Sequence, residues 1–162
     1  MSKIEVFETT VQKSYEWLND LNKLLGWKDS HRSYLALRAT LHALRDRLPV
    51  DIGANFSSQL PMLIRGFYFE SWQPSSTPVK ARSAAEFLNL VAIHLDNTIL
   101  AHEEDLEKVV RSVFIVITSH ISIGEIYHIK RALPEPIALL WPSIEFSEEL
   151  EREIKSDPLS KL

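Results

Sequence analysis

Cysteine is absent from this sequence of 162 residues. A chain without cysteine forms no disulfide, has no thiolate nucleophile and offers no sulfur ligand to zinc or to an iron–sulfur cluster. The four glycines stand far apart, at positions 26, 53, 66 and 124, so the sequence contains no glycine-rich phosphate loop. The G-x-S-x-G pattern of a nucleophile elbow is also missing. These absences exclude several classes of enzyme.

Long apolar runs and basic clusters are lacking as well. No stretch of about 18 uncharged apolar residues occurs, and the first ten residues, MSKIEVFETT, contain two acids and no signal-peptide core. We therefore expect a cytoplasmic protein without membrane insertion. The net charge is −4, and residues 82–162 carry fourteen acidic and eight basic residues. Phosphate binding depends on clustered Lys and Arg, so nucleic acid is not an expected partner, and a DNA-binding helix-turn-helix is not favoured.

The composition that remains is that of a globular domain, with 45% hydrophobic and 25% charged residues. A chain of this length buries roughly 70% of its unfolded surface and needs no disulfide or metal to hold it together. We expect residues 1–162 to form a single domain.

An internal repeat organises this domain. With an offset of 73 residues, the segment 37–69 aligns without a gap with the segment 110–142, and the apolar positions match throughout. Upstream, the offset falls to 70 residues. The alignment predicts two similar units, at about 10–72 and about 83–142. The stretch between them, QPSSTPVKAR at 73–82, is rich in proline and serine and is predicted to be a linker.

Each unit has helical periodicity. In the first unit, apolar residues from Val11 to Leu25 recur every three or four positions, and Gly26 can end that helix. Asp29 or Ser30 offers the N-cap of a second helix that runs to Pro49. A short third helix is predicted at about 51–60, and a fourth begins at Pro61.

The second unit has clearer helix starts. Ser83 with Glu86, and Ser122 with Glu125, have the spacing of capping boxes, and HEEDLEK at 102–108 places acids in a first helical turn. The β-branched run VFIVIT at 113–118 resembles a buried strand, but it aligns with the helical TLHALR of the first unit. We predict a helix there, and expect it to be the most buried of all.

A last amphipathic helix is predicted at about 146–156. The apolar residues that indicate it are Ile144, Phe146, Leu150 and Ile154. The predicted fold is therefore an all-α bundle of eight or nine helices, in two pseudo-repeats packed face to face.

The order of several short motifs resembles a known family. LPMLIRGFYFESW at 60–72 is followed by the proline-containing linker and RSAAEFL, and later by SHISIGEIYHIKRALP and LLWP. This combination is similar to the bacterial domain-of-unknown-function family numbered 2267, over roughly Tyr15 to Pro142. The resemblance implies a small, all-helical protein built from two repeats. It implies no activity, cofactor or catalytic residue, because the family has none established.

The titratable residues do not form a familiar catalytic or metal-binding pattern. Two pairs of histidines, His94 with His102 and His120 with His128, are eight residues apart, which does not suit a helical zinc site. Acidic clusters lie at predicted helix starts, where the helix dipole gives them a structural role. We therefore predict no catalytic residue, no metal site and no cofactor.

A candidate ligand site lies where the two units differ. LPMLIRGFYFESW has a shorter, almost apolar counterpart, LPEPIALLWP, and features that both share are explained as scaffold. We predict that the polar and aromatic residues that distinguish the first unit line a groove for an anionic or aromatic group, together with a basic residue of the linker. These residues are Arg65, Tyr68, Glu70, Trp72 and Arg82. In the alternative explanation, Arg65 pairs with Glu70 or another local acid and Tyr68 belongs to the core.

Two functions follow from these observations. The first is a non-enzymatic interaction module, a homo-oligomer or a binder of another protein, acting through the C-terminal helix or the segment 65–72. Apolar residues in excess of the helical stripes favour it, among them Ile4, Val6, Phe7, Ile144 and Phe146. The alternative is a small-molecule carrier or an uncommon enzyme that uses the groove between the repeats.

Overall fold

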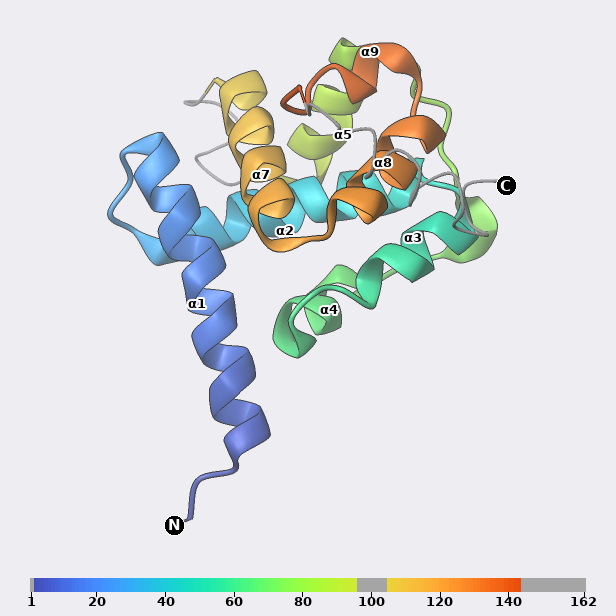
Figure 1. Cartoon of the computed structure of the whole chain (residues 1–162). Coiled ribbons are helices and arrows are strands. Elements are labelled where there is room, and N and C mark those ends of the chain that lie inside the picture. Colours follow the sequence, from blue (N-terminus) through green and yellow to red (C-terminus); the bar gives the residue numbers. More distant parts are fainter. Residues whose placement is uncertain (1, 96–104, 144–162) are drawn as a thin grey trace.

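The computed structural model describes residues 2–95 and 105–143, and all regular secondary structure in this part of the chain is helical (Figure 1). The predicted all-α fold is confirmed. The predicted helix at 146–156 lies outside the described residues. Within them the helices are α1 (Glu5–Leu25), α2 (Ser30–Arg47), α3 (Val50–Ser57), α4 (Met62–Tyr68), the 3-10 turn η1 (Pro74–Ser76), α5 (Ala84–Leu95), α7 (Leu106–His120), α8 (Ile123–Ala132) and α9 (Glu135–Ala138).

Local sequence signals set most of the helix ends. α1 ends at Gly26, whose φ of 69° is the left-handed conformation that glycine adopts without strain. Asp29 caps α2, because its carboxylate accepts the backbone N–H of His31 at 3.0 Å. At α5, the Ser83 hydroxyl accepts the Glu86 amide at 3.1 Å, as the capping box predicts.

Three other starts differ in detail from the sequence prediction. Pro61 occupies the N-cap position of α4, so the helix begins one residue later than expected. Ser122 accepts the Glu125 amide at 3.3 Å, but the Glu125 carboxylate accepts a hydrogen bond from Asn55 of α3 at 2.9 Å. Asp105 is the N-cap of α7, and residues 102–104 lie outside the described part of the chain. Tertiary contacts thus change the use of these capping residues.

α2 is the central helix of the molecule. It packs against α1, α3, α4, α5 and α7, and Figure 1 shows these elements arranged around it. Ten of its 18 residues are buried, compared with seven of 15 in α7. The run at 113–118 is helical as predicted, but the expectation that its helix is the most buried is wrong. α7 keeps one exposed side, which includes Ile115.

The helices of the two halves are interleaved. α1 packs against α7, and α5 packs against α2, so the first helix of each predicted unit contacts the second helix of the other. α3 likewise packs against α8. The two predicted units therefore share one core, to which both halves contribute side chains.

Two pairs of helix starts follow the sequence offset. α3 begins at Val50 and α8 at Ile123, while α4 begins at Met62 and α9 at Glu135, and both intervals equal 73 residues. These intervals support the two-repeat organisation, which stays a prediction.

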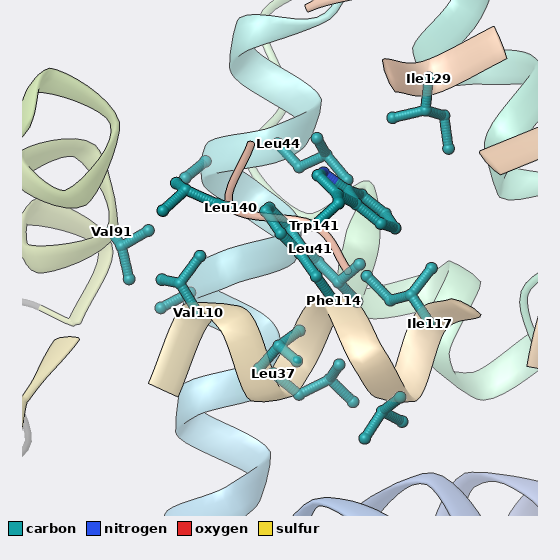
Figure 2. Close-up of a cluster of buried hydrophobic side chains, with 14 of the residues drawn as sticks. Leu37, Leu41, Leu44, Val91, Val110, Phe114, Ile117, Ile129, Leu140 and Trp141 are labelled. Carbon is teal, nitrogen blue, oxygen red and sulfur yellow. The ribbon is translucent and has the colours of Figure 1, made fainter. Parts of the chain in front are cut away.

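The core contains side chains from both halves (Figure 2). Leu37, Leu41 and Leu44 of α2 meet Phe114 of α7 and Trp141, which follows α9. The rings of Phe114 and Trp141 stack with centroids 4.1 Å apart and an interplanar angle of 12°. Across residues 2–95 and 105–143, no helix has both the length and the apolar composition needed to span a membrane.

Candidate functional site

A patch of exposed apolar side chains lies on α1 and α4. Twelve large apolar residues are exposed in the described part of the chain, and six of them belong to this patch. Each of the six is 42–60% exposed. We call the patch the α1–α4 face and define it by Ile4, Phe7, Val11, Tyr15, Met62 and Leu63. Exposed apolar residues are ordinary when single, but gathered ones are typical of binding surfaces.

Part of this face borders an open groove of about 770 Å³ between α1, α2 and α4. Its lining includes Tyr15 and Leu18 of α1, Tyr34 of α2, Phe67 of α4 and also Glu70. The Tyr34 and Phe67 rings meet edge to face, with centroids 5.3 Å apart. The lining is largely apolar, and the volume lies in the range of ligand-binding pockets.

Half of the apolar face belongs to an N-terminal extension of α1, because α1 begins earlier than α5 when the two units are aligned. Ala84, the first residue of α5, aligns with Ser14, and its cap Ser83 aligns with Lys13 in the interior of α1. The turns of α1 before Ser14 therefore have no aligned counterpart in α5. The N-terminus lies at the far end of this extension (Figure 1).

A second feature is a polar cluster on one side of α2. His42, Arg45 and Asp46 are spaced three and four residues apart, so they share a helix face. The His42 Nε2–H donates to the Phe67 carbonyl at 2.6 Å. Arg45 Nη1 donates to the carbonyls of Tyr68 and Glu70 at 2.8 and 2.7 Å. These side chains donate to carbonyls at and just after the end of α4, where intrahelical partners run out. The Phe67 carbonyl also accepts the backbone N–H of Glu70 at 3.2 Å.

Asp46 links this cluster to α5. Its carboxylate accepts from Arg45 Nε and pairs with His94 Nε2, each at 2.9 Å. Burial raises the pKa of Asp46, but the hydrogen bonds from His94 and Arg45 outweigh burial and hold the pKa below its ordinary value. Asp46 is therefore ionised at neutral pH, and balances the buried guanidinium of Arg45.

His42 is neutral at physiological pH. Burial is the largest cause that lowers its pKa, to about 4, and the positive charges of Arg45, His94 and Arg38 act in the same direction. The hydrogen bond to Phe67 opposes this shift.

The polar cluster forms one wall of a pocket of about 450 Å³ between α2, α5 and the segment 71–79. We call it the polar pocket. Its polar lining residues are Arg38, His42, Arg45, Asp46, Ser71, Gln73, Ser76, Thr77 and His94. It shares no lining residue with the apolar groove. The segment 71–79 lies largely within the predicted linker, which therefore contributes to a pocket wall.

The structure places Arg65 and Tyr68 in internal hydrogen bonds. Arg65 donates to the carbonyls of Ser57, Ser58 and Leu60, at 2.9, 3.2 and 3.1 Å. Tyr68 is fully buried, and its hydroxyl donates to the Gly53 carbonyl at 2.8 Å. Burial also raises the pKa of Tyr68. Both side chains thus join α4 to α3, and Tyr68 belongs to the core, as the alternative explanation held.

The other predicted residues have separate neighbours. The Glu70 carboxylate is 3.5 Å from Arg38 Nε, so its partner is Arg38 rather than Arg65. Trp72 packs beside Phe69, with ring centroids 5.2 Å apart. Arg82 is exposed. The pKa of Arg47, at the end of α2, is lowered first by the burial of Arg47 itself and then by the positive charge of Arg82. A ligand-binding role for these residues stays a prediction.

Sequence reasoning missed Arg38, His42, Asp46 and His94 as members of one site. One signal was available, because His42, Arg45 and Asp46 interrupt the apolar pattern of a helix at its own periodicity. The pairing of Asp46 with His94, 48 residues later in the sequence, depends on how α5 packs on α2. No three metal-ligating side chains gather within the described residues in a way that could hold a metal ion.

The comparisons with known proteins concern most of the chain. No curated protein matches it. The model of one family matches residues 14–140, and this family is described as uncharacterized conserved protein (DUF2267). The match starts where α1 and α5 begin to correspond. The resemblance found in the short motifs is therefore confirmed, and the chain belongs to the DUF2267 family.

Proposed function

We propose that this protein is a self-association module, and that the α1–α4 face binds the same face of a second copy. The observation that carries the proposal is the exposed stripe along α1. Ile4, Phe7, Val11 and Tyr15 recur at helical spacing, and they face solvent although they have the pattern of a packed helix.

The buried part of α1 shows what such a stripe requires. Further along the helix, Ser14, Trp17 and Leu21 are buried, and α1 as a whole packs against α2, α4 and α7. The turns of α1 before Ser14 have the same apolar periodicity, but their side chains Ile4, Phe7 and Val11 stay exposed within the described part of the chain. Burying one large apolar side chain contributes about 1.5–3 kcal/mol, so a partner that covers several of them gains substantial affinity.

The charges of the extension favour a second copy as that partner. Residues 2–13 contain two lysines and two glutamates, and hence no net charge. Lys3 and Glu8 pair at 3.5 Å. In a symmetric dimer the same surface meets itself, so a surface that is apolar and neutral avoids like-charge repulsion.

A lipid surface fits the extension less well. Interfacial helices have a polar face rich in Lys and Arg, which attracts anionic lipids. α1 carries four acidic residues and two lysines, so its polar face is acidic: Glu5, Glu8, Lys13, Glu16, Asp20 and Lys23. Three of the six residues of the α1–α4 face, Ile4, Phe7 and Val11, lie before the start of the family match.

Light scattering over a concentration series tests this proposal. We expect the wild-type chain to dimerise, and Phe7→Glu to weaken the dimer roughly 100-fold, because each dimer loses two apolar contacts and gains two charges. Leu139→Glu is the matched control, since Leu139 is 64% exposed and Phe7 is 60% exposed. A wild-type chain that stays monomeric up to near-millimolar concentration contradicts the proposal. So does a dimer that both substitutions weaken equally.

A further inference from the structure

The polar pocket contains an arginine whose hydrogen bonds are incomplete. Arg38 lines the pocket, and its Nε atom is buried with no hydrogen-bond partner among the described residues. Its nearest charged neighbour, the Glu70 carboxylate, is 3.5 Å away. Charge-assisted hydrogen bonds between guanidinium and carboxylate are typically about 2.7–2.9 Å long. Glu70 is exposed and therefore holds Arg38 only loosely.

The other charges of the pocket are already balanced. Arg45 is buried, and donates to Asp46 and to two backbone carbonyls. Asp46 is occupied by Arg45 and His94. His42 is neutral and donates to Phe67. Arg38 is thus the lining cation with capacity for a further acceptor.

The wall opposite α2 supplies neutral hydrogen-bonding groups. Ser71, Gln73, Ser76 and Thr77 all line the pocket. Ser71 has φ of 60°, and is the one non-glycine residue of the described chain in the left-handed region. Such a conformation is strained and persists where neighbouring contacts fix it. Here Arg45 holds the carbonyl of Glu70, the residue just before Ser71, at 2.7 Å.

We infer that the polar pocket binds a small molecule through an oxyanion, a carboxylate or a phosphate group, with Arg38 as the charged contact. Arg38 pairs with the anion in place of Glu70, while Ser71, Gln73 and Ser76 donate to its remaining oxygens. Guanidinium groups match carboxylate and phosphate geometry. A volume of about 450 Å³ lies in the range of small-ligand pockets. This function goes beyond self-association, and uses a different part of the surface.

Anion titrations followed by NMR test the inference on the full chain. Inorganic phosphate and acetate serve as probes, each at constant ionic strength against chloride, with the His42 and His94 ring resonances as readout. Saturable shifts with phosphate identify the ligand group as a phosphate, and saturable shifts with acetate identify it as a carboxylate. We expect one of the two probes to saturate.

Arg38→Gln should weaken the saturating anion roughly tenfold to hundredfold, the usual effect of losing a hydrogen bond to a charged group. Arg111→Gln is the matched control, because it removes the same charge at the position that aligns with Arg38. Arg111 pairs with Glu107 and donates to the Leu139 carbonyl. Gln73→Ala, in the exposed linker segment, should weaken binding several-fold, and gives a second test if Arg38→Gln is poorly folded. The inference is overturned if neither anion saturates, or if Arg38→Gln and Arg111→Gln have equal effects.

Discussion

The α2–α4 region and the α7–α9 region occupy aligned parts of the sequence, but different chemistry holds each together. In the first, His42 and Arg45 donate to carbonyls at the end of α4. The aligned residues of α7 are Ile115 and Thr118. In the second region, Trp141 after α9 stacks on Phe114. Arg111 and Lys130 donate to the carbonyls of Leu139 and Pro142, at 3.1 and 3.3 Å, and both are more exposed than Arg45.

This difference indicates where specific function can arise. Both regions solve the same packing problem, so either solution suffices for the fold. The buried polar solution additionally fixes the strained turn at Ser71 and positions Arg38, His42 and His94 around a pocket. Aromatic stacking in the second region leaves no comparable group of polar side chains at the aligned positions of α7. The first region therefore carries the candidate ligand site.

The largest expected effect comes from removing the buried arginine. Arg45→Met should destabilise the protein by about 3–5 kcal/mol, because it deprives two backbone carbonyls of their donor and removes the cationic partner of the half-buried Asp46 carboxylate. Thr118→Ala, at the aligned position of α7, should lower the free energy of unfolding by about 1 kcal/mol or less, since it removes one local hydrogen bond. Urea unfolding measures both, and equal losses would remove the distinction between the two regions.

A smaller effect is expected from pH. The unfolded chain protonates His42 with a pKa of 6.5, whereas the folded chain does so only at about 4. Acid therefore favours the unfolded state, and stability due to this group falls as pH drops from 6.5 toward 4. The loss should reach about 2–3 kcal/mol.

His42→Gln sharpens this test, because glutamine keeps an N–H donor for the Phe67 carbonyl and does not titrate. The difference in unfolding free energy between the variant and the wild type, measured in urea at neutral pH and near pH 4.5, isolates His42 from the other histidines. An identical acid response in both proteins would show that the folded state accepts the proton on His42 easily.

The smallest expected effect concerns the start of α5 compared with the interior of α1. Ser83→Ala removes the cap of α5, and should cost about 1 kcal/mol. Lys13→Ala, at the aligned position inside α1, should change the free energy of unfolding by less than about 0.5 kcal/mol, because that helix continues through it. Thermal unfolding of both variants checks the contrast, and a comparable loss at Lys13 would argue against it.

The helices could be predicted because their signals are local. Apolar spacing, Gly26, Asp29 and the Ser83–Glu86 pair all act within a few residues, and the aligned TLHALR correctly identified the β-branched run at 113–118 as helical. The most buried helix was misjudged, because burial depends on neighbours from both halves. α2 has them on more sides than α7.

The polar sites were harder to predict, because their partners are distant in sequence. Arg65 and Tyr68 differ from the second unit as a ligand site would, but their partners are backbone carbonyls in and after α3, which carry no sequence signal. The same holds for His42 and Arg45, whose acceptors lie 23 to 25 residues away. An unusual polar residue in a sequence indicates a buried contact, while the kind of contact is visible only in the fold.

Crosslinking through a single introduced cysteine tests the self-association of the α1–α4 face most directly, because the natural sequence contains none. Gln12→Cys, at an exposed position next to Val11 on α1, and Leu139→Cys are each treated with a short bismaleimide at low protein concentration. We predict a covalent dimer for Gln12→Cys and a monomer for Leu139→Cys. Equal crosslinking of the two variants, or none at Gln12→Cys, would contradict the proposed interface.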